Sequence, residues 1–184
     1  MMMKTINKPN FYLFTGGPGA GKTSVIDHLK QQGHLVVPEA ARAIIQHQRS
    51  IGGNATHDGD RILYTERMLQ QSIADFENLM SVEKNVYFDR GIPDLYSYSS
   101  RFCQGVTPPV LQAVERYRYN TLAFVFPPWP EIYCHDNERK QAFDEAVETW
   151  EAVIAGYQAA GYQTIEVPEM SVAGRADFIQ GKIV

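Results

Sequence analysis

The sequence predicts an α/β fold in which a five-stranded, mainly parallel sheet lies between two layers of helices. Short apolar runs alternate with segments of helical composition along all 184 residues, a pattern typical of parallel sheets. The first run, residues 11–14, is continuously apolar, as expected of a strand buried on both faces. A glycine-rich stretch follows it and opens a helix. Ligands gather at the carboxyl ends of such strands, so polar residues that follow a strand are the candidates for a site.

The elements of the first half are marked by their ends and by their apolar spacing. Residues 23–32 have helical composition, and Gly33 follows as a helix stop. The apolar run 34–38 is the second strand, and residues 40–48 form the next helix. A glycine-containing loop then precedes a long helix at about 60–82, whose apolar residues recur at helical spacing.

Prolines and strand-like runs mark the elements of the second half. Residues 85–89 form a third strand that ends in a carboxylate, and residues 121–126 form the fourth. Helices begin near Pro93 and Pro108, because proline suits the first helical turn. The last elements are a helix at about 140–160, a strand at 163–167 and a helix over 171–179.

Composition and charge indicate an ordinary globular protein. The 44% hydrophobic and 21% charged content are average values, and the length suits one domain over residues 1–184. A formal net charge of −4 argues against general nucleic-acid binding. Cys103 and Cys134 lack the spacing of a zinc site and fit a reducing cytoplasm. The longest early apolar run has four residues, too few for a signal peptide or a membrane span. We therefore expect a cytoplasmic protein.

The glycine-rich stretch matches the phosphate-binding pattern G-x-x-x-x-G-K-[ST]. It consists of Gly16, Gly17, Pro18, Gly19, Ala20, Gly21, Lys22 and Thr23, and Ser24 follows. Side chains must be absent for backbone N–H groups to converge on phosphate oxygens, and the N-terminus of the following helix adds its positive dipole end. We expect this loop to bind ATP or GTP, with Lys22 on the outer phosphates and the Thr23 hydroxyl on Mg²⁺. The expected fold is the three-layer P-loop NTPase fold of nucleotide-kinase type.

Other residues separate the classes of P-loop protein. A guanine-specific N/T-K-x-D run is absent after any expected strand, which weakens the reading as a GTPase. Motor-type ATPases carry paired acids at the end of a later strand, and the second acid activates water. Here the third strand ends in Asp89 followed by Arg90. An arginine suits the gripping of a substrate, which favours a small-molecule kinase.

Five stretches in this order resemble a known family: TGGPGAGKTSVIDHL, VVPEAAR, VYFDRGIPD, NER and GYQTIEVPEMSVAGRADFI. They are similar to the AAA-labelled P-loop family that includes the nicotinamide-riboside-kinase-like domain of NadR and related predicted ATPases. The likeness covers nearly the whole chain, and its later motifs are more specific than the glycine loop. It implies a nucleotide-kinase-like fold that binds ATP or GTP with Mg²⁺. Deoxynucleoside kinases are distantly similar.

Two carboxylates follow strands at the expected ligand edge. Glu39 comes after the second strand, where it would take the proton from a substrate hydroxyl, or would simply be an acid at a helix N-terminus. Asp89 ends a buried strand, where an unpaired carboxylate is costly. Binding Mg²⁺ together with Thr23 would explain Asp89, and so would pairing with Lys22 or Arg90. We favour Glu39 as the base and Asp89 as the metal ligand; Asp89 becomes the preferred base if the metal assignment is wrong.

Four further charged residues each have two possible roles. Arg90 would grip the acceptor or a phosphate in bidentate fashion, or form a salt bridge to a nearby acid. Arg42 shares a helix face with Arg49 and would line the acceptor pocket, or belong to a solvated face. Asp94 would bind substrate or stabilise the helix that starts after Pro93. Arg175 would fix the last helix or flank the nucleotide base.

The proline-rich segment 127–140 follows the fourth strand and has the position of a lid. Its Arg139 would add positive charge at the transferring phosphoryl group, or would be a helix-end charge. Trp129 would stack on a base or pack against the prolines.

Together these residues predict a phosphotransferase that moves the γ-phosphoryl group to a small hydroxyl-bearing, nucleoside-like acceptor. The rival hypothesis is a nucleotide-dependent switch with slow hydrolysis and a protein or lipid partner. A kinase needs the base, the acceptor grip and the lid that Glu39, Arg90 and Arg139 would supply, and a switch needs none of them.

Overall fold

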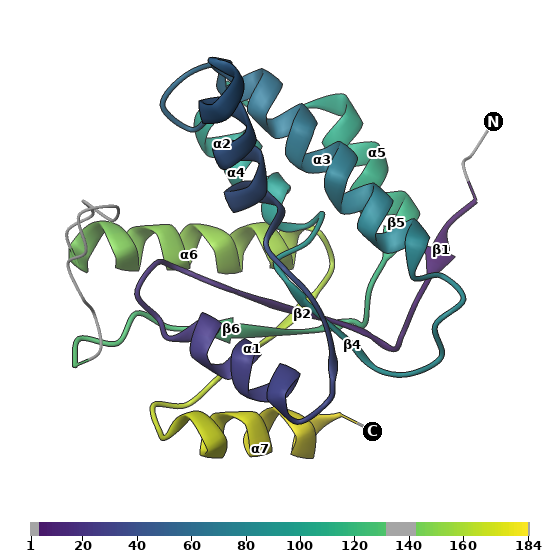
Figure 1. Cartoon of the computed structure of the whole chain (residues 1–184), viewed down its shortest axis with the longest axis vertical. Helices are drawn as coiled ribbons and strands as arrows, with labels where there is room; N and C mark the ends of the chain where they lie inside the picture. The colour runs from purple at the N-terminus through teal and green to yellow at the C-terminus, as the bar shows by residue number, and fades with distance from the viewer. Residues whose placement is uncertain (1–3, 132–142, 184) are drawn as a thin grey trace.

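The computed structural model describes residues 4–131 and 143–183, and it confirms the α/β fold (Figure 1). The central sheet has the strand order β3–β4–β2–β6–β7, and each strand pairs in parallel with its neighbours. Its strands are β2 (Phe11–Gly16), β3 (Leu35–Val37), β4 (Val86–Asp89), β6 (Leu122–Phe126) and β7 (Gln163–Glu166). All five expected strands are therefore present, within about two residues of the predicted bounds.

Seven helices connect and cover the strands in the described residues. They are α1 (Lys22–Gln31), α2 (Ala40–Ile51), α3 (Arg61–Asn78), α4 (Asp94–Phe102), α5 (Pro108–Arg116), α6 (Phe143–Ala159) and α7 (Val172–Lys182). The main difference from the sequence prediction is the end of α3, which stops before residue 82. There Lys8 Nζ donates to the backbone oxygens of Met80 and Val82, both at 2.9 Å, and holds the chain in turns.

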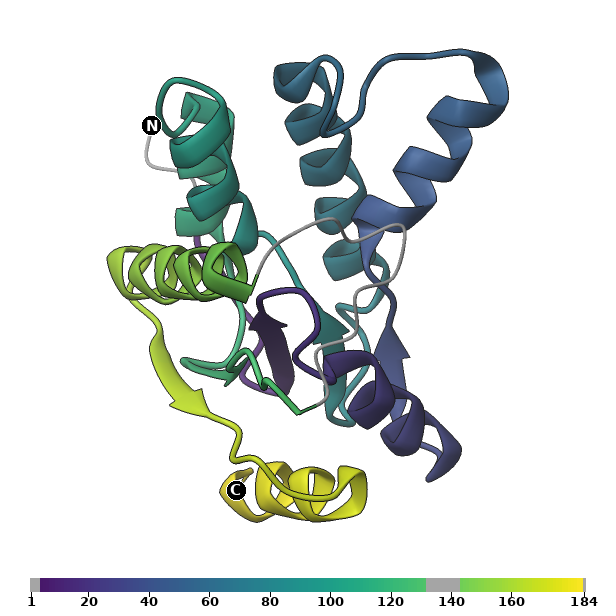
Figure 2. The same cartoon turned by 90° about the vertical axis from the view of Figure 1, so that its left-hand side faces the viewer.

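The two faces of the sheet are covered by different helices. Helices α1 and α7 lie on one side, and α3 to α6 lie on the other (Figures 1 and 2). Side chains of a strand alternate between these layers. From β2, Phe11 and Leu13 join the core under α3 to α6, whereas Tyr12 and Phe14 join the core under α1 and α7. This double burial explains why β2 reads as one continuous apolar run.

Two further strands of two residues each were not predicted. β1 (Ile6–Asn7) pairs in parallel with β5 (Tyr117–Arg118) as a separate small sheet. Segments of this length carry no period that sequence reasoning can use. They lie at the opposite end of the strands from the glycine loop (Figure 1).

Candidate nucleotide and acceptor site

The glycine loop leaves the carboxyl end of β2 and passes directly into α1. A Cβ on Gly16 would lie 2.4 Å from the backbone oxygen of Phe126, so β2 and β6 approach too closely there for any side chain. Gly19 and Gly21 have φ values of 71° and 69°, in the left-handed region that favours glycine. Gly21 is the N-cap of α1 and supplies no side-chain cap, which leaves the first N–H groups of the helix to the loop. This backbone is suited to bind an anion.

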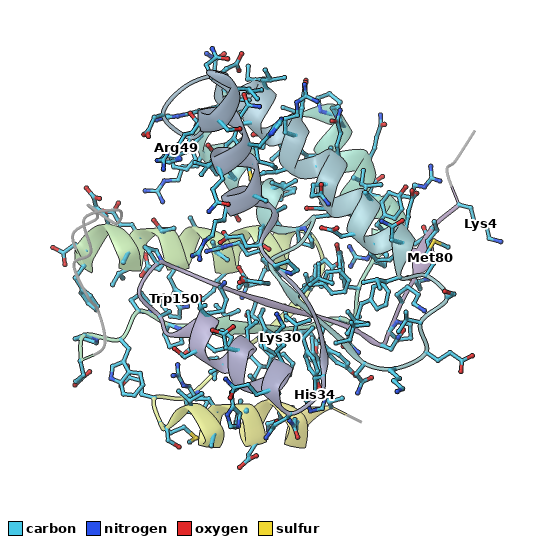
Figure 3. All side chains as sticks on the ribbon, in the orientation of Figure 1. Lys4, Lys30, His34, Arg49, Met80 and Trp150 are labelled. Carbon is cyan, nitrogen blue, oxygen red and sulfur yellow. The ribbon has the colours of Figure 1, made fainter. Side chains whose placement is uncertain are left out.

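Helix α6 supports the loop from outside. A Cβ on Gly17 would lie 2.9 Å from the backbone oxygen of Ala146 and 3.8 Å from Cβ of Trp150. Trp150 is labelled beside the loop in Figure 3. Because α6 packs this closely, only glycine fits at position 17.

Lys22 and Asp89 form a buried ion pair between α1 and the end of β4. Burial lowers the pKa of Lys22, and the neighbouring Asp89 carboxylate opposes that change. Thr23 and Ser24 follow in the first turn of α1 and are exposed. The pairing of Lys22 with Asp89 is one of the two explanations that the sequence offered for a carboxylate at this strand end.

Arg90 lies at the centre of the site, immediately after β4. Its Nε donates to Glu39 Oε1 at 3.0 Å, and its Nη2 donates to the backbone oxygen of Gly16 at 2.7 Å. Its Nη1 donates to Asp94 Oδ1 at 3.1 Å and to Thr15 Oγ1 at 3.4 Å. Burial opposes the charge of Arg90, but these carboxylates outweigh it and raise its pKa. Each of the three guanidinium nitrogens thus donates at least one hydrogen bond, and Arg90 links the Glu39 carboxylate to the glycine loop.

Asp94 anchors this arrangement from the start of α4. Its Oδ1 accepts from Thr15 Oγ1 at 2.5 Å as well as from Arg90. Its Oδ2 accepts from the backbone N–H of Gly91 at 2.9 Å and from the Tyr157 hydroxyl at 2.6 Å. Asp94 therefore accepts hydrogen bonds from four donors in the interior of the protein. The sequence had suggested two other roles for it, substrate binding or stabilisation of the helix that starts after Pro93. The signal was present as Thr15, a polar residue at the end of an otherwise apolar run.

Glu39 is the N-cap residue of α2, but its side chain makes no capping hydrogen bond. The carboxylate turns instead to Arg90, and 28% of its side-chain surface stays exposed. Burial alone would raise the pKa of Glu39, but Arg90, Lys22 and Arg42 together bring it below its ordinary value of 4.5. Arg42 is exposed one helical turn further on, and Arg49 lies near the distant end of α2 (Figure 3).

A cavity opens between α2, α3 and the carboxyl end of β4. The charged residues that line it within the described part of the chain are Glu39, Asp75, Asp89, Arg90 and Asp94. Its apolar wall includes Val37, Met68, Phe88, Leu95 and Tyr119. Glu39, which follows β3, and Asp89, which ends β4, thus line the same cavity. Asp75 of α3 was not among the residues that the sequence singled out.

Arg175 of α7 approaches the glycine loop from the other layer. Its Nη1 donates to the backbone oxygen of Ala20 at 3.2 Å, and its guanidinium lies 5.5 Å from the centre of the Trp129 ring. The side chain is buried, and burial lowers its pKa. The sequence placed Arg175 either in support of α7 or near the nucleotide base, and this contact brings it to the loop itself.

Arg139 and most of the lid-like segment lie outside the described residues, which include only 127–131 of that segment. Within the described part of the chain there is no group of three or more His, Cys, Asp or Glu residues arranged to hold a metal. No helix there is both long and apolar enough to cross a membrane.

The sheet order, the glycine loop and the Lys22–Asp89 pair define a P-loop protein with a nucleotide-kinase-like fold. A family model described as an AAA domain matches residues 11–175, and the chain belongs to that family. A search of curated proteins finds no significant match to the sequence.

Solved structures share the fold at low sequence identity. NadR protein in complex with NR is 17% identical with a TM-score of 0.68; the match covers 99% of this chain and 52% of that one, so this chain spans about half of its length. Deoxyadenosine kinase from M. mycoides, with products dcmp and dcdp, is 12% identical with a TM-score of 0.54, over 94% and 97% of the two chains. Shikimate kinase from Acinetobacter baumannii, in complex with shikimate, is 15% identical with a TM-score of 0.50, over 92% and 90%. Two of these three neighbours are named as kinases, and all three share the fold that the sequence predicts.

Proposed function

We propose that the protein transfers the γ-phosphoryl group of ATP to a hydroxyl of a small, nucleoside-like acceptor. The observation that carries the proposal is the bridge through Arg90, which bonds both the Glu39 carboxylate and the Gly16 backbone oxygen of the phosphate loop. A candidate base is thereby tied to the place where a phosphate would lie. The small molecules named with the structural neighbours support a small acceptor.

The loop residues fit a nucleotide. Gly19 and Gly21 have the backbone conformation of a phosphate cradle, and α1 begins without a side-chain cap. Lys22 would exchange its pairing with Asp89 for the outer phosphates. Thr23 and Asp89 would then hold Mg²⁺, which shields phosphate charge when it is bound. GTP would satisfy the same contacts, so the choice of ATP rests on the missing guanine-specific motif.

Glu39 would accept the proton of the acceptor hydroxyl. Its lowered pKa keeps the carboxylate ionised at neutral pH, and Arg90 fixes the direction in which it points. With all three of its nitrogens engaged, Arg90 is a positioning residue in this proposal rather than an acceptor ligand. Among the described residues, Arg42 is exposed near Glu39 and would meet the acceptor or the transferred phosphoryl group at the mouth of the site.

The test compares Glu39→Gln and Asp89→Asn with Glu115→Gln, a control on the exposed face of α5. Transfer from labelled ATP to a nucleoside library and ATP affinity are measured for each protein. We expect Glu39→Gln to bind Mg-ATP normally and to lose transfer by a factor of about 10²–10⁴, the usual contribution of a general base. Asp89→Asn should raise the Mg²⁺ concentration needed for half-maximal activity.

Three outcomes would contradict the proposal. Glu39→Gln with a rate within twofold of the wild type would remove Glu39 as the base. An unchanged Mg²⁺ titration in Asp89→Asn would move Asp89 from the metal to the base. Slow hydrolysis that no acceptor accelerates would favour the nucleotide-dependent switch.

A further inference from the structure

The charge balance of the cavity beside Glu39 restricts what can enter it. Among the described residues that line it, four carboxylates (Glu39, Asp75, Asp89 and Asp94) face a single guanidinium, Arg90. Lys22 compensates Asp89 from the loop side through their ion pair. The described lining is therefore acidic, and within it Arg90 is the one cation that an incoming ligand would meet inside the cavity.

Each guanidinium nitrogen of Arg90 already donates to a protein group, and the carboxylates of Glu39 and Asp94 balance its charge. Its Nε bonds Glu39, its Nη1 bonds Asp94, and its Nη2 bonds the Gly16 backbone oxygen. Freeing any of them would leave a buried or half-buried partner unsatisfied, which costs about 1–3 kcal/mol. Arg42 does not line the cavity, and its side chain is exposed.

Asp75 provides the opposite wall of the same cavity. It lies on α3, its side chain is half-buried, and one carboxylate oxygen accepts from Gln71 Nε2 at 2.8 Å. A carboxylate can accept several hydrogen bonds, so Asp75 keeps the capacity to bind hydroxyl groups. The lining of the same cavity also includes the apolar side chains of Met68, Phe88 and Leu95. This combination suits an uncharged group that presents hydroxyls.

We propose that the acceptor carries no negative charge in the part that enters this cavity, and that Asp75 selects for such acceptors by accepting hydrogen bonds from their hydroxyl groups. The inference rests on the proposed function for the identity of the site, but it concerns binding alone. Anionic alcohols are disfavoured because, among the described residues that line the cavity, they would meet four carboxylates and one guanidinium whose charge is already balanced. Uncharged alcohols meet no such electrostatic repulsion when they enter the cavity.

The test uses matched ligand pairs, so that contacts to the part that both members share contribute equally to the two affinities. Ribonucleosides, deoxyribonucleosides and cyclic polyols are each compared with their own monophosphates. Their affinities are measured by calorimetry on the full chain with Mg²⁺ and a non-hydrolysable ATP analogue present. We expect the uncharged member of a pair to bind at least tenfold more tightly. If in no pair the uncharged member binds more tightly, including the case in which none binds, the inference is overturned.

Two variants locate the selectivity. Asp75→Asn keeps the shape of the side chain and removes its charge, and Glu66→Gln is the control, an exposed acid on the same helix. We expect Asp75→Asn to weaken the uncharged ligands about fivefold and to reduce the preference over monophosphates, whereas Glu66→Gln leaves both unchanged. Thermal unfolding of each variant verifies the fold. An unaltered preference in folded Asp75→Asn would remove Asp75 as the selecting residue.

A parallel transfer assay separates this inference from the proposed function. Tight binding of uncharged alcohols without phosphoryl transfer would overturn the kinase proposal and leave the inference standing. Phosphoryl transfer to anionic acceptors alone would overturn this inference and leave the kinase proposal standing.

Discussion

Two arginines reach the same glycine loop, Arg90 from the end of β4 and Arg175 from α7, and they differ in how their charge is balanced. Arg90 bonds the backbone oxygen of Gly16 at 2.7 Å, and Arg175 bonds that of Ala20 at 3.2 Å. Arg90 also pairs with two carboxylates, and its pKa is raised. No ion pair between described residues includes Arg175, whose guanidinium faces the Trp129 ring and whose pKa is lowered by burial.

The difference separates structural support from ligand attraction. A guanidinium that two carboxylates neutralise contributes little positive potential beyond its partners, but it fixes their positions. A buried guanidinium without a carboxylate partner keeps its field, and a bound phosphate is the kind of group that would repay its desolvation. We therefore interpret Arg90 as the organiser of the acceptor side and Arg175 as a source of attraction on the nucleotide side.

Truncation of Arg90 should have the largest effect on stability. Arg90→Ala leaves Glu39 and the buried Asp94 without their cation, and breaking such a pair costs about 3 kcal/mol. Urea unfolding monitored by circular dichroism measures the loss, with Arg42→Ala as the exposed control. A loss no larger than that of the control would mean that the Arg90 network does not hold the site together.

Arg175→Ala should show the opposite pattern. Because no described carboxylate pairs with Arg175, its removal should cost less stability than Arg90→Ala but weaken ATP binding about tenfold, or about 1.4 kcal/mol. Arg175→Lys should recover part of the affinity, since a point charge cannot reproduce the guanidinium contact to Ala20 and Trp129. Calorimetric titration with ATP decides the matter. Equal ATP affinity in Arg175→Ala and the wild type would show that Arg175 does not contribute to nucleotide binding.

A smaller effect is expected at Tyr157, the donor that connects α6 to Asp94. Tyr157→Phe keeps the buried ring and removes one of the four donors to Asp94, so we expect a loss of about 1 kcal/mol. Tyr162→Phe is a matched control, because the Tyr162 hydroxyl accepts a long hydrogen bond, 3.4 Å, from the backbone N–H of Tyr119 and bonds no carboxylate in the described part of the chain. If the two variants unfold at the same urea concentration, the hydrogen bond from the Tyr157 hydroxyl to Asp94 does not stabilise the protein.

The sequence predicted those features that depend on local pattern. The run of β2, the glycine loop, Glu39 after β3 and Asp89 at the end of β4 each occupy a short stretch with its own signal. The parallel sheet then brings the strand ends to one edge, so Lys22 and Asp89 could be expected to meet although 67 positions separate them.

The partners of Asp94 and Arg175 could not be predicted in the same way. Asp94 meets Thr15 and Tyr157 across 79 and 63 positions, and Arg175 meets Ala20 across 155. These contacts depend on how α4, α6 and α7 pack and rotate against the sheet, and no residue period records that packing. The role of Asp75 has the same origin, since it depends on which face of α3 borders the cavity.

The smallest effect that the comparison predicts is a shift in pH dependence, seen after each protein's rate is normalised to its own maximum. In the wild type, burial tends to raise the pKa of Glu39, and Arg90 is the strongest of the cations that bring it below its ordinary value. A lysine at position 90 has no fork with which to bond Glu39 and Asp94 together. With Glu39 less stabilised as an anion, burial is less opposed and the pKa of Glu39 rises. A base must be unprotonated to act, so the acid limb of kcat/KM should move to higher pH in Arg90→Lys, while the alkaline limb stays in place. Arg175→Lys, which alters the other arginine, should leave the acid limb where it is. Coincident acid limbs in all three proteins would show that Arg90 does not govern the protonation of Glu39.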